Sequence, residues 1–557
     1  MQVKEQNIKK ILVLLLAMSA VVRGVLAAWM EFGNDEVYYW TYALYPDWSH
    51  FDHPPMVGWI IQIFSINLLL DSEFFIRLAS VVFMTADTYI IYRIGTEIKD
   101  ARTGLYAALL YTASIYAFVI TGIFIMPDTP LMLFWLLAFW MGVRFLFGLP
   151  PSARNDTKRG VDVIARWDDE AIQRDSPARC MHLLLFGLFA GLAMLSKYSG
   201  VFLWVGMGLY ILVFDRKQLI NPYLYLALLI SAVFCLPILF WNVQYDFVSL
   251  RFHGDRVGGN RLNFSTFGTE LAGEFLYNNP VLFILTIVTI IAAFKKRISI
   301  EKSVQRLILC IALPMILVFW VFALMRPTLP HWNSPAYVLL ILLSAVYLRD
   351  KHDESVKLPK SIIAALSVLV ITLVIGVAEI KTGFIPLDKH TEPEMLGRDD
   401  FTLDMYGWRQ LGEKFADFRA QKIAEGVMSE EDGIVANQWF PLANLDYYVA
   451  RPLNMRVMGL GWPGQLHKYL WINDERGGFH LGENYWFLSD SRYPKDPTTT
   501  YQWFFKEIEL VGVIEIDRCG KPAKNFFVYT CKDLCDQPPT LQSVMAASAA
   551  KDTKSRQ

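Results

Sequence analysis

Apolar runs long enough to cross a bilayer recur between residues 11 and 378, and they limit the possible folds more than any other feature of the chain. About 20 apolar residues are needed to span the hydrocarbon core as a helix. Hydrophobic residues make up 54% of the 557, and the mean hydropathy is +0.32. The sequence therefore predicts a polytopic α-helical membrane protein, with spans at 11–29, 74–95, 103–121, 129–147, 182–196, 198–214, 222–240, 278–294, 306–325, 333–349 and 361–378.

Several short runs leave the number of spans open. The segment 56–70 is apolar but short, so we expect it to lie against the membrane without crossing it. Counting the other short runs in different ways gives about 11 to 13 transmembrane helices. The N-terminus has the basic start and apolar core of a signal peptide, but Arg23 within the run and the later spans favour an uncleaved first helix.

The distribution of basic residues predicts the orientation. Lysine and arginine are enriched in the cytoplasmic loops of membrane proteins. The basic residues of the N-terminus and of the segments 149–181, 295–297 and 349–360 fall on one side of this arrangement. The loop after the first span and the C-terminal third then fall on the opposite, external side. The net charge of −1 gives no indication of nucleic-acid binding.

The composition changes after Pro386, where long apolar runs stop. Residues 407–421 have the period of an amphipathic helix, and strand-like composition follows at 433–438, 484–489, 510–517 and 525–531. About 150 residues suffice for a domain with its own core. We therefore divide the chain into a transmembrane domain (1–385), an external α/β domain (386–540) and a disordered tail (541–557).

Three of the six cysteines, Cys519, Cys531 and Cys535, belong to this external domain. One disulfide is possible among them in an oxidising compartment. Their spacing does not choose the pair.

The loop after the first span has an unusual charge balance. Between Arg23 and Arg77 the chain has no lysine or arginine but seven acids: Glu31, Asp35, Glu36, Asp47, Asp52, Asp71 and Glu73. We call residues 30–55, which hold five of these acids, the acidic loop. A membrane loop need only be polar, so this composition indicates a reaction site.

Asp35 and Glu36 are the first candidates within the acidic loop. A carboxylate just outside the bilayer, beside the aromatic rings of Tyr38 and Tyr39, can act as a general base for an acceptor hydroxyl. The segment 34–36 is equally typical of a helix N-terminus, where polar side chains cap the first turn. The sequence leaves both interpretations open.

The acidic loop ends in His50-Phe51-Asp52-His53, followed by two prolines. Aspartate and histidine are suitable ligands for a divalent ion that neutralises a phosphate. The spacing matches no specific metal motif, and a polar turn ended by prolines is the simpler alternative. A metal ion at Asp52 is therefore a hypothesis.

Two further ionisable residues lie at expected external ends of spans. Asp128 is fixed between Pro127 and Pro130, which favours a site over a loop cap. Lys197 is a lone external lysine, against the trend of the other basic residues. Ionisable groups at membrane depth are expensive and usually functional. Lys197 is thus a candidate for holding a phosphate, and a lysine that only extends to the interface is the alternative.

The external segments 241–277 and 326–332 add basic groups: Arg251, His253, Arg256, Arg261, Arg326 and His331. A basic loop facing an acidic one suggests the binding of an anion. Aromatic and imidazole side chains around it are expected to line a pocket for the acceptor or the sugar: Tyr38, Tyr39, His331 and Trp332.

These motifs occur in an order that resembles a known family. DE in the acidic loop, FDHPP at its end, MPDTP, and LSK between two short apolar segments are similar to motifs of glycosyltransferases that use polyprenyl-phosphate sugars. This group has the C-type glycosyltransferase fold and includes protein O-mannosyltransferases, the aminoarabinose transferase of lipid A and rhizobial galacturonosyltransferases of lipopolysaccharide. The resemblance covers residues 1–380, and the segments GWRQLGEKF and VANQWFPLANLDYYV resemble the external domain of a bacterial branch.

The resemblance implies roles for individual residues. Acids that act in catalysis correspond to Asp35, Glu36 and Asp128. Groups that hold the donor phosphate correspond to His53, Lys197 and Arg256, although the aminoarabinose branch has a lysine in place of His53. Ligands of a divalent metal ion correspond to Asp52 and His253.

The implied reaction is the inverting transfer of a sugar from a polyprenyl-phosphate carrier to a lipid, glycan or protein acceptor. Such a reaction needs mainly positioning and charge stabilisation. The resemblance implies a bacterial inner membrane, with the C-terminal domain on the periplasmic side and membrane lipids, but no nucleic acid, as partners. Two alternatives remain: a polyprenyl-linked lipid flippase or transporter, which needs polar groups at mid-bilayer, and a membrane-anchored glycan-binding protein.

Overall fold

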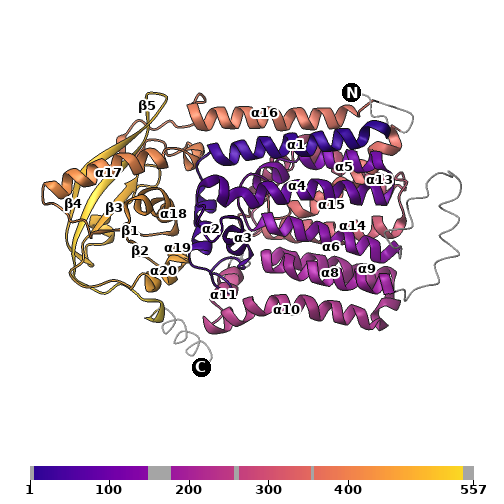
Figure 1. Cartoon of the computed structure of the whole chain (residues 1–557), viewed down its shortest axis with the longest axis horizontal. Helices are drawn as coiled ribbons and strands as arrows, with labels where there is room; N and C mark the ends of the chain where they lie inside the picture. The colour runs from indigo at the N-terminus through magenta and orange to yellow at the C-terminus, as the bar shows by residue number, and fades with distance from the viewer. Residues whose placement is uncertain (1–4, 148–176, 256–261, 353–356, 544–557) are drawn as a thin grey trace.

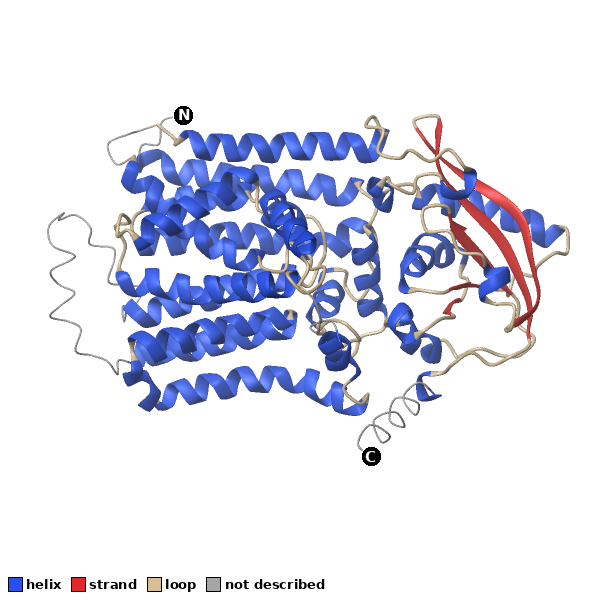
Figure 2. Ribbon diagram, turned by 180° about the vertical axis from the view of Figure 1, so that it is seen from behind, coloured by secondary structure: helices blue, strands red, loops and turns tan. Residues whose placement is uncertain are grey.

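The computed structural model describes residues 5–147, 177–255, 262–352 and 357–543. A bundle of roughly parallel helices forms one end of the molecule, and a smaller domain with a β-sheet stands at the other end (Figure 1; strands red in Figure 2). We call the end of the bundle that faces this C-terminal domain the domain end.

The bundle is built from long apolar helices joined by shorter ones. The long helices are α1 (Glu5–Trp29), α4 (Glu73–Ile98), α6 (Asp128–Phe147), α8 (Pro177–Ser196), α10 (Pro222–Gln244), α14 (Lys302–Ala323), α15 (Ser334–Lys351) and α16 (Lys360–Thr382). The shorter ones are α2 (Asn34–Leu44), α3 (Met56–Phe64), α5 (Ala101–Ala113), η1 (Tyr116–Ile120), η2 (Tyr198–Val201), α9 (Phe202–Phe214), η3 (Arg216–Ile220), α11 (Val248–Asp255), α12 (Phe264–Tyr277) and α13 (Pro280–Phe294).

Among the described residues, seven helices are long and apolar enough to cross a membrane, or eight if the bent pair α12–α13 counts as one. All eleven expected spans lie on helices, and the chain is an integral membrane protein. The expected count of 11 to 13 is not reached by length and composition, because α5 and α9 have only 13 residues each and α15 ends in charged residues. These three helices nevertheless lie within the bundle, among the long ones (Figure 1). The segment 56–70 forms the nine-residue helix α3, too short to cross.

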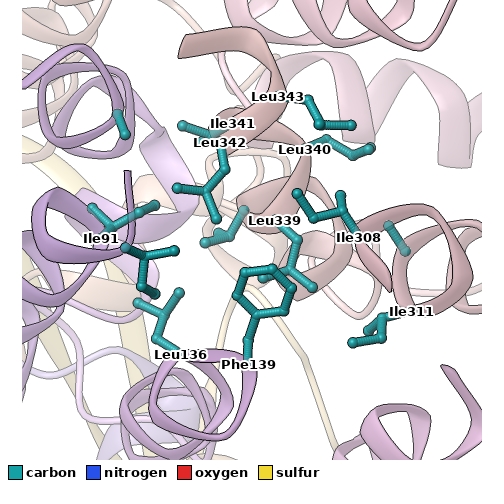
Figure 3. Close-up of a cluster of buried hydrophobic side chains, with 14 of the residues drawn as sticks. Ile91, Leu136, Phe139, Ile308, Ile311, Leu339, Leu340, Ile341, Leu342 and Leu343 are labelled. Carbon is teal, nitrogen blue, oxygen red and sulfur yellow. The ribbon is translucent and has the colours of Figure 1, made fainter. Parts of the chain in front are cut away.

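The core of the bundle is a continuous apolar cluster around α15. Leu339 to Leu343 of α15 are buried on every side, against Ile91 of α4, Leu136 and Phe139 of α6 and Ile308 of α14 (Figure 3). A helix that is apolar on all faces belongs at the centre of such a bundle. The outer helices α1, α10 and α16 instead leave most of their apolar surface uncovered, as lipid-facing helices do.

The C-terminal domain contains a five-stranded sheet in the order β2-β1-β3-β5-β4. Its strands are β1 (Gly433–Ala436), β2 (Val457–Gly459), β3 (Tyr485–Asp490), β4 (Phe505–Arg518) and β5 (Lys521–Leu534). Strands β2, β1 and β3 are parallel, and β3, β5 and β4 are antiparallel. Its helices are α17 (Trp408–Ala424), α18 (Trp439–Asn444), α19 (Pro463–Leu466), α20 (Tyr469–Glu475) and α21 (Pro497–Thr500), with the shorter helical turns η4 (Pro393–Met395), η5 (Phe401–Met405), η6 (Leu445–Ala450) and η7 (Arg451–Leu453).

The predicted amphipathic helix and four strands are confirmed as α17, β1, β3, β4 and β5. The short strand β2 was not predicted. The disulfide considered possible does not form in this structure, where Cys519, Cys531 and Cys535 are thiols. Cys531 is buried in β5, whereas Cys519 lies at the turn between β4 and β5 and Cys535 follows the far end of β5.

Candidate active site

The acidic loop lies at the domain end, where α2 and α3 meet the C-terminal domain (Figure 1). Contacts between the two parts are numerous and specific. The backbone N–H of Trp408 donates to Glu31 Oε2 at 2.8 Å, and Arg409 Nη2 lies 2.5 Å from Glu73 Oε1. The Tyr448 hydroxyl accepts from the backbone N–H of Phe32 at 2.7 Å. The C-terminal domain therefore forms one wall around the acidic loop.

Glu36 is held at the start of α2 by a complete set of donors. Arg77 of α4 donates from Nε to Oε1 at 2.7 Å and from Nη2 to Oε2 at 2.6 Å. The backbone N–H groups of Gly33 and Ile125 donate to the same two oxygens at 2.9 and 3.1 Å. The helix-start interpretation of this segment is confirmed, since α2 begins at Asn34 with Glu36 closing its first turn.

Asp35 differs from Glu36 in its exposure and in its hydrogen bonding. Its side chain is exposed, and no hydrogen-bond donor among the described residues reaches its carboxylate. Protein atoms nevertheless surround it closely enough that burial, followed by the charges of Asp52 and Glu36, raises its pKa to about 6. An accessible carboxylate with a pKa near neutrality suits proton transfer.

Asp52 is the centre of a buried hydrogen-bond network. Its Oδ1 accepts from the hydroxyl of Tyr38 at 2.9 Å and from that of Tyr42. His467 of the C-terminal domain places Nδ1 3.8 Å from Oδ2. Burial raises the pKa of Asp52, but His467, His53 and the two hydroxyls outweigh burial and lower it below its usual value. Asp52 is therefore a fixed negative charge.

Three more histidines belong to the same cluster as Asp52 and His467. Burial lowers the pKa of His53 to about 3, with Asp52 opposing and Lys197 reinforcing the shift. The Nε2 of His253, on α11, lies 2.8 Å from the backbone carbonyl oxygen of Asp52 and not against its carboxylate. His50 has its pKa lowered by burial and then by Lys468. The imidazoles of His50 and His53 are therefore neutral near pH 7, which is the form that binds metals.

The side chain of Lys468, a residue of the C-terminal domain, lies against the acidic loop. Its Nζ donates to Nδ1 of His50 at 2.8 Å and to the carbonyl oxygen of Tyr45. The side chain is buried. Burial lowers the pKa of Lys468 to about 7, although Asp47 and Asp52 oppose the shift.

Asp128 and Lys197 form a second buried pair at the domain end. Lys197 Nζ lies 2.7 Å from Asp128 Oδ2, and the hydroxyl of Tyr116 donates to Oδ1 at 2.8 Å. Asp128 begins α6, while Lys197 lies in the break between α8 and η2. The ammonium group predicted to hold a phosphate thus has an acid partner in this structure.

His331 and the pocket aromatics complete the site. Burial and then Lys197 lower the pKa of His331 to about 4, and its ring lies 6.1 Å from that of Tyr277. The charge of Asp35 acts on both the Tyr277 and the Tyr39 hydroxyls, so both are close to it. Trp332 instead packs against Phe319 of the bundle core, with ring centroids 5.9 Å apart. Arg256 lies outside the described residues.

The structure brings together most residues of the predicted set but not all. Asp35, Asp52, His53, Asp128, Lys197, His253 and His331 are linked by mutual electrostatic effects or direct contacts. In the described ranges, the cluster of metal-binding type is a different one, formed by Asp388, His390 and Asp399 after α16. It is a partly exposed set in which Asp388 also accepts from backbone N–H groups.

Four residues that matter for the geometry were not predicted from the sequence: Arg77, Tyr277, His467 and Lys468. A signal existed for Arg77, which is an arginine within an apolar run, and such groups are rarely without function. His467 and Lys468 lie more than 400 residues from their partners, with separations of 415 for His467 and Asp52 and 418 for Lys468 and His50. No local pattern marks them.

Comparison with known proteins is consistent with this arrangement. Residues 52–147 and 171–241 match the family model described as dolichyl-phosphate-mannose-protein mannosyltransferase. The structure is similar to that of ArnT from Cupriavidus metallidurans in the apo state, with a TM-score of 0.57 and 15% sequence identity, over 94% of this chain and 98% of that one. The chain therefore shares the fold of this ArnT structure.

The same enzyme bound to undecaprenyl phosphate gives a TM-score of 0.56 at 15% identity, over 93% of this chain and 97% of that chain. A curated relative, lipid A galacturonosyltransferase RgtD of Rhizobium johnstonii, is 22% identical over 348 residues. That match spans 61% of this chain and 65% of the relative. The family resemblance predicted from the motifs, and the predicted fold of a helical membrane part with a C-terminal sheet domain, are confirmed.

Proposed function

We propose that the protein is an inverting glycosyltransferase that takes a sugar from a polyprenyl-phosphate carrier and passes it to a lipid acceptor. The observation that carries this proposal is the contrast between two adjacent carboxylates. Glu36 has its acceptor positions filled by Arg77 and two backbone N–H groups, whereas Asp35 is exposed, lacks a donor among the described residues and has a pKa of about 6. Only Asp35 is free to exchange a proton.

The reaction is a single displacement. The acceptor hydroxyl oxygen attacks the anomeric carbon, the bond from that carbon to the phosphate oxygen breaks, and its electron pair leaves with the phosphate. Asp35 takes the hydroxyl proton. One displacement inverts the configuration, and the main task left to the protein is to stabilise the charge on the departing phosphate.

We assign that task to Lys197, His53 and Arg256, as the motifs predict. Lys197 is held in place by Asp128, with 2.7 Å between Nζ and Oδ2, so its ammonium is fixed before a substrate arrives. A preorganised charge costs no reorganisation during the reaction. Asp128 and Glu36 then act as positioning residues, the one through Lys197 and the other through Arg77.

A divalent ion at Asp52 and His253 remains part of the proposal. The carboxylate of Asp52 and the imidazole of His253 are donor types that suit a divalent metal. The Nε2 of His253 donates to the Asp52 carbonyl oxygen at 2.8 Å, so Nδ1 would be the metal ligand. Activity that survives exhaustive chelation, with no metal found by elemental analysis, would leave the phosphate to the basic residues alone.

Relatives suggest the substrate classes. The name of RgtD gives lipid A as its acceptor, and the ArnT structure holds undecaprenyl phosphate. We therefore propose an undecaprenyl-type donor and a lipid-linked glycan acceptor. We also place the reaction on the periplasmic side of the bacterial inner membrane. Because Cys519 and Cys535 are exposed on the C-terminal domain, a membrane-impermeant maleimide should label them in intact spheroplasts.

The decisive experiment incubates purified protein with a panel of labelled polyprenyl-phosphate sugars and with lipid, glycan and peptide acceptors. We expect the label to move to a lipid-linked glycan, and the product to have inverted anomeric configuration. Transfer to peptide alone would change the acceptor class. Movement of labelled carrier across vesicle bilayers, without transfer from any donor, would favour the transporter alternative.

A further inference from the structure

The C-terminal domain reaches into the acidic loop with two consecutive residues, His467 and Lys468. They lie between α19 and α20, and both are buried. His467 has a backbone φ of 50°, in the left-handed region that side chains other than glycine rarely adopt. Such backbone strain persists only where surrounding contacts impose it, and it is concentrated at functional sites.

The two residues contact the acidic loop at several separate points. His467 faces the Asp52 carboxylate at 3.8 Å, and its ring packs 5.0 Å from that of Phe51. Lys468 binds Nδ1 of His50 at 2.8 Å and the Tyr45 carbonyl, while its backbone N–H donates to the Tyr38 hydroxyl at 3.3 Å. The dipeptide His467-Lys468 therefore contacts both ends of the segment from Tyr45 to Asp52.

The chemistry of Lys468 indicates what it does there. A buried ammonium group is expensive unless it is paired or fully hydrogen-bonded. Lys468 donates to a carbonyl oxygen and an imidazole nitrogen of the acidic loop, and not to a carboxylate. A residue that only attached the domain to the bundle would serve as well in an exposed ion pair, as Arg451 does with Asp71 at 2.5 Å.

We propose that His467 and Lys468 are positioning residues, which hold the Tyr45–His53 segment in its working shape so that the C-terminal domain is a structural half of the donor site. The inference rests on the proposed function, because Asp52 and His53 belong to the donor side of that reaction. A domain that merely covered the site would instead affect the acceptor.

The test compares Lys468→Met with Lys468→Arg and with a matched control, Arg451→Met, which removes a cation from the same interface at its exposed edge. Amide hydrogen exchange of peptides covering residues 45–53 needs no substrate. We expect exchange there to rise about tenfold or more in Lys468→Met, less in Lys468→Arg, and not at all in Arg451→Met, because loss of a buried donor exposes its partners. Unchanged exchange in Lys468→Met would overturn the proposal.

Steady-state kinetics supply the second measurement. For Lys468→Met we expect kcat/KM for the donor to fall about tenfold or more while KM for the acceptor stays within about threefold. A rise confined to the acceptor KM would mean that the domain only selects the acceptor. Should Lys468→Met fail to fold, Lys468→Arg carries both measurements, since it keeps the charge but not the geometry. If the wild-type protein transfers no sugar, the exchange experiment still decides the positioning role.

Discussion

Among the described residues, the most deeply buried ion pairs of the helix bundle lie at the domain end, although exposed pairs such as Arg451–Asp71 also occur there. At the domain end, the side chains of Glu36 and Arg77 are 2% and 0% exposed, and those of Asp128 and Lys197 are 2% and 9% exposed. At the opposite end, the Arg349–Asp100 pair is 18% and 33% exposed and the Lys99–Asp350 pair 20% and 23%. The pairs Glu36–Arg77 and Asp128–Lys197 are therefore almost fully desolvated, whereas these two pairs at the opposite end are partly hydrated.

This difference separates two uses of charge. A half-exposed ion pair is worth about 0–1 kcal/mol and needs no functional explanation. A buried pair gains little net stability, yet breaking it costs about 3–5 kcal/mol because one charge stays behind uncompensated. Buried pairs at the domain end are thus a poor way to stabilise the fold but a good way to fix a group in place.

The largest effect should come from Asp35, the exposed acid beside these buried pairs. Asp35→Asn removes the proposed base, and loss of a general base typically lowers the rate 10²- to 10⁴-fold. The measurement is kcat/KM for sugar transfer, with Asp35→Glu as a control that keeps a carboxylate. Retention of more than about a tenth of the activity in Asp35→Asn would argue against a base at this position.

The second effect concerns the fold at the domain end. Arg77→Met leaves Glu36 buried without its two charged donors, so unfolding in detergent should become easier by about 3–5 kcal/mol. The double variant Glu36→Gln with Arg77→Met should recover part of this loss. If the single variant is as stable as the wild type, water reaches Glu36 and the pair is not the fixed element described above.

The third effect is a dependence on pH. Because the pKa of Asp35 is raised to about 6, the base form is depleted below that pH. We expect kcat/KM to rise about tenfold per pH unit up to about pH 6 and then to level off. If Asp35→Glu does not shift the pH at which kcat/KM levels off, the rise at low pH belongs to another group.

The raised pKa of Asp35 also makes the stability of the fold depend on pH. The sign of this dependence is opposite to that of an acid whose pKa is lowered by an ion pair. A raised carboxyl pKa means that its contribution to stability is present below the ordinary value of 3.8 and is lost as the pH rises through about 6. Asp35→Asn should therefore melt at a higher temperature than the wild type at pH 8 but not at pH 4.

The smallest effect is expected at the opposite end of the bundle. Arg349→Met removes the Arg349–Asp100 pair, which should cost less than about 1 kcal/mol and leave sugar transfer unchanged. Thermal unfolding and the transfer assay measure the two quantities. If Arg349→Met lost as much stability as Arg77→Met, the buried and the partly exposed ion pairs would not differ in the way described above.

The sequence predicted the helices and most strands because their signals are local. An apolar run identifies a span wherever it packs, and α17, β3 and β5 carry their period or composition within a few residues. Two features were not predicted from the sequence, each for a physical reason. Strand β2 has only three residues, and the expected span 103–121 divides at Ser114, where α5 ends before η1 begins.

The site was predictable only in part. Unusual charge placement pointed to Asp35, Asp128 and Lys197, but it did not distinguish Asp35 from Glu36. That distinction depends on Arg77, which is brought to Glu36 by the packing of α4 against the acidic loop. The wall formed by the C-terminal domain arises from contacts between distant parts of the chain, for which a single sequence holds no local signal.

The contact between His50 and Lys468 joins residues 418 positions apart. The ribosome makes the acidic loop before the bundle helices that follow it, and the segment that secures the loop only after them. The helices from α3 to α16 are made in between, so the acidic loop leaves the ribosome before Lys468 is present. A chain that stops before residue 468 therefore contains every helix of the bundle but lacks the partner of His50, so its acidic loop is left without this contact.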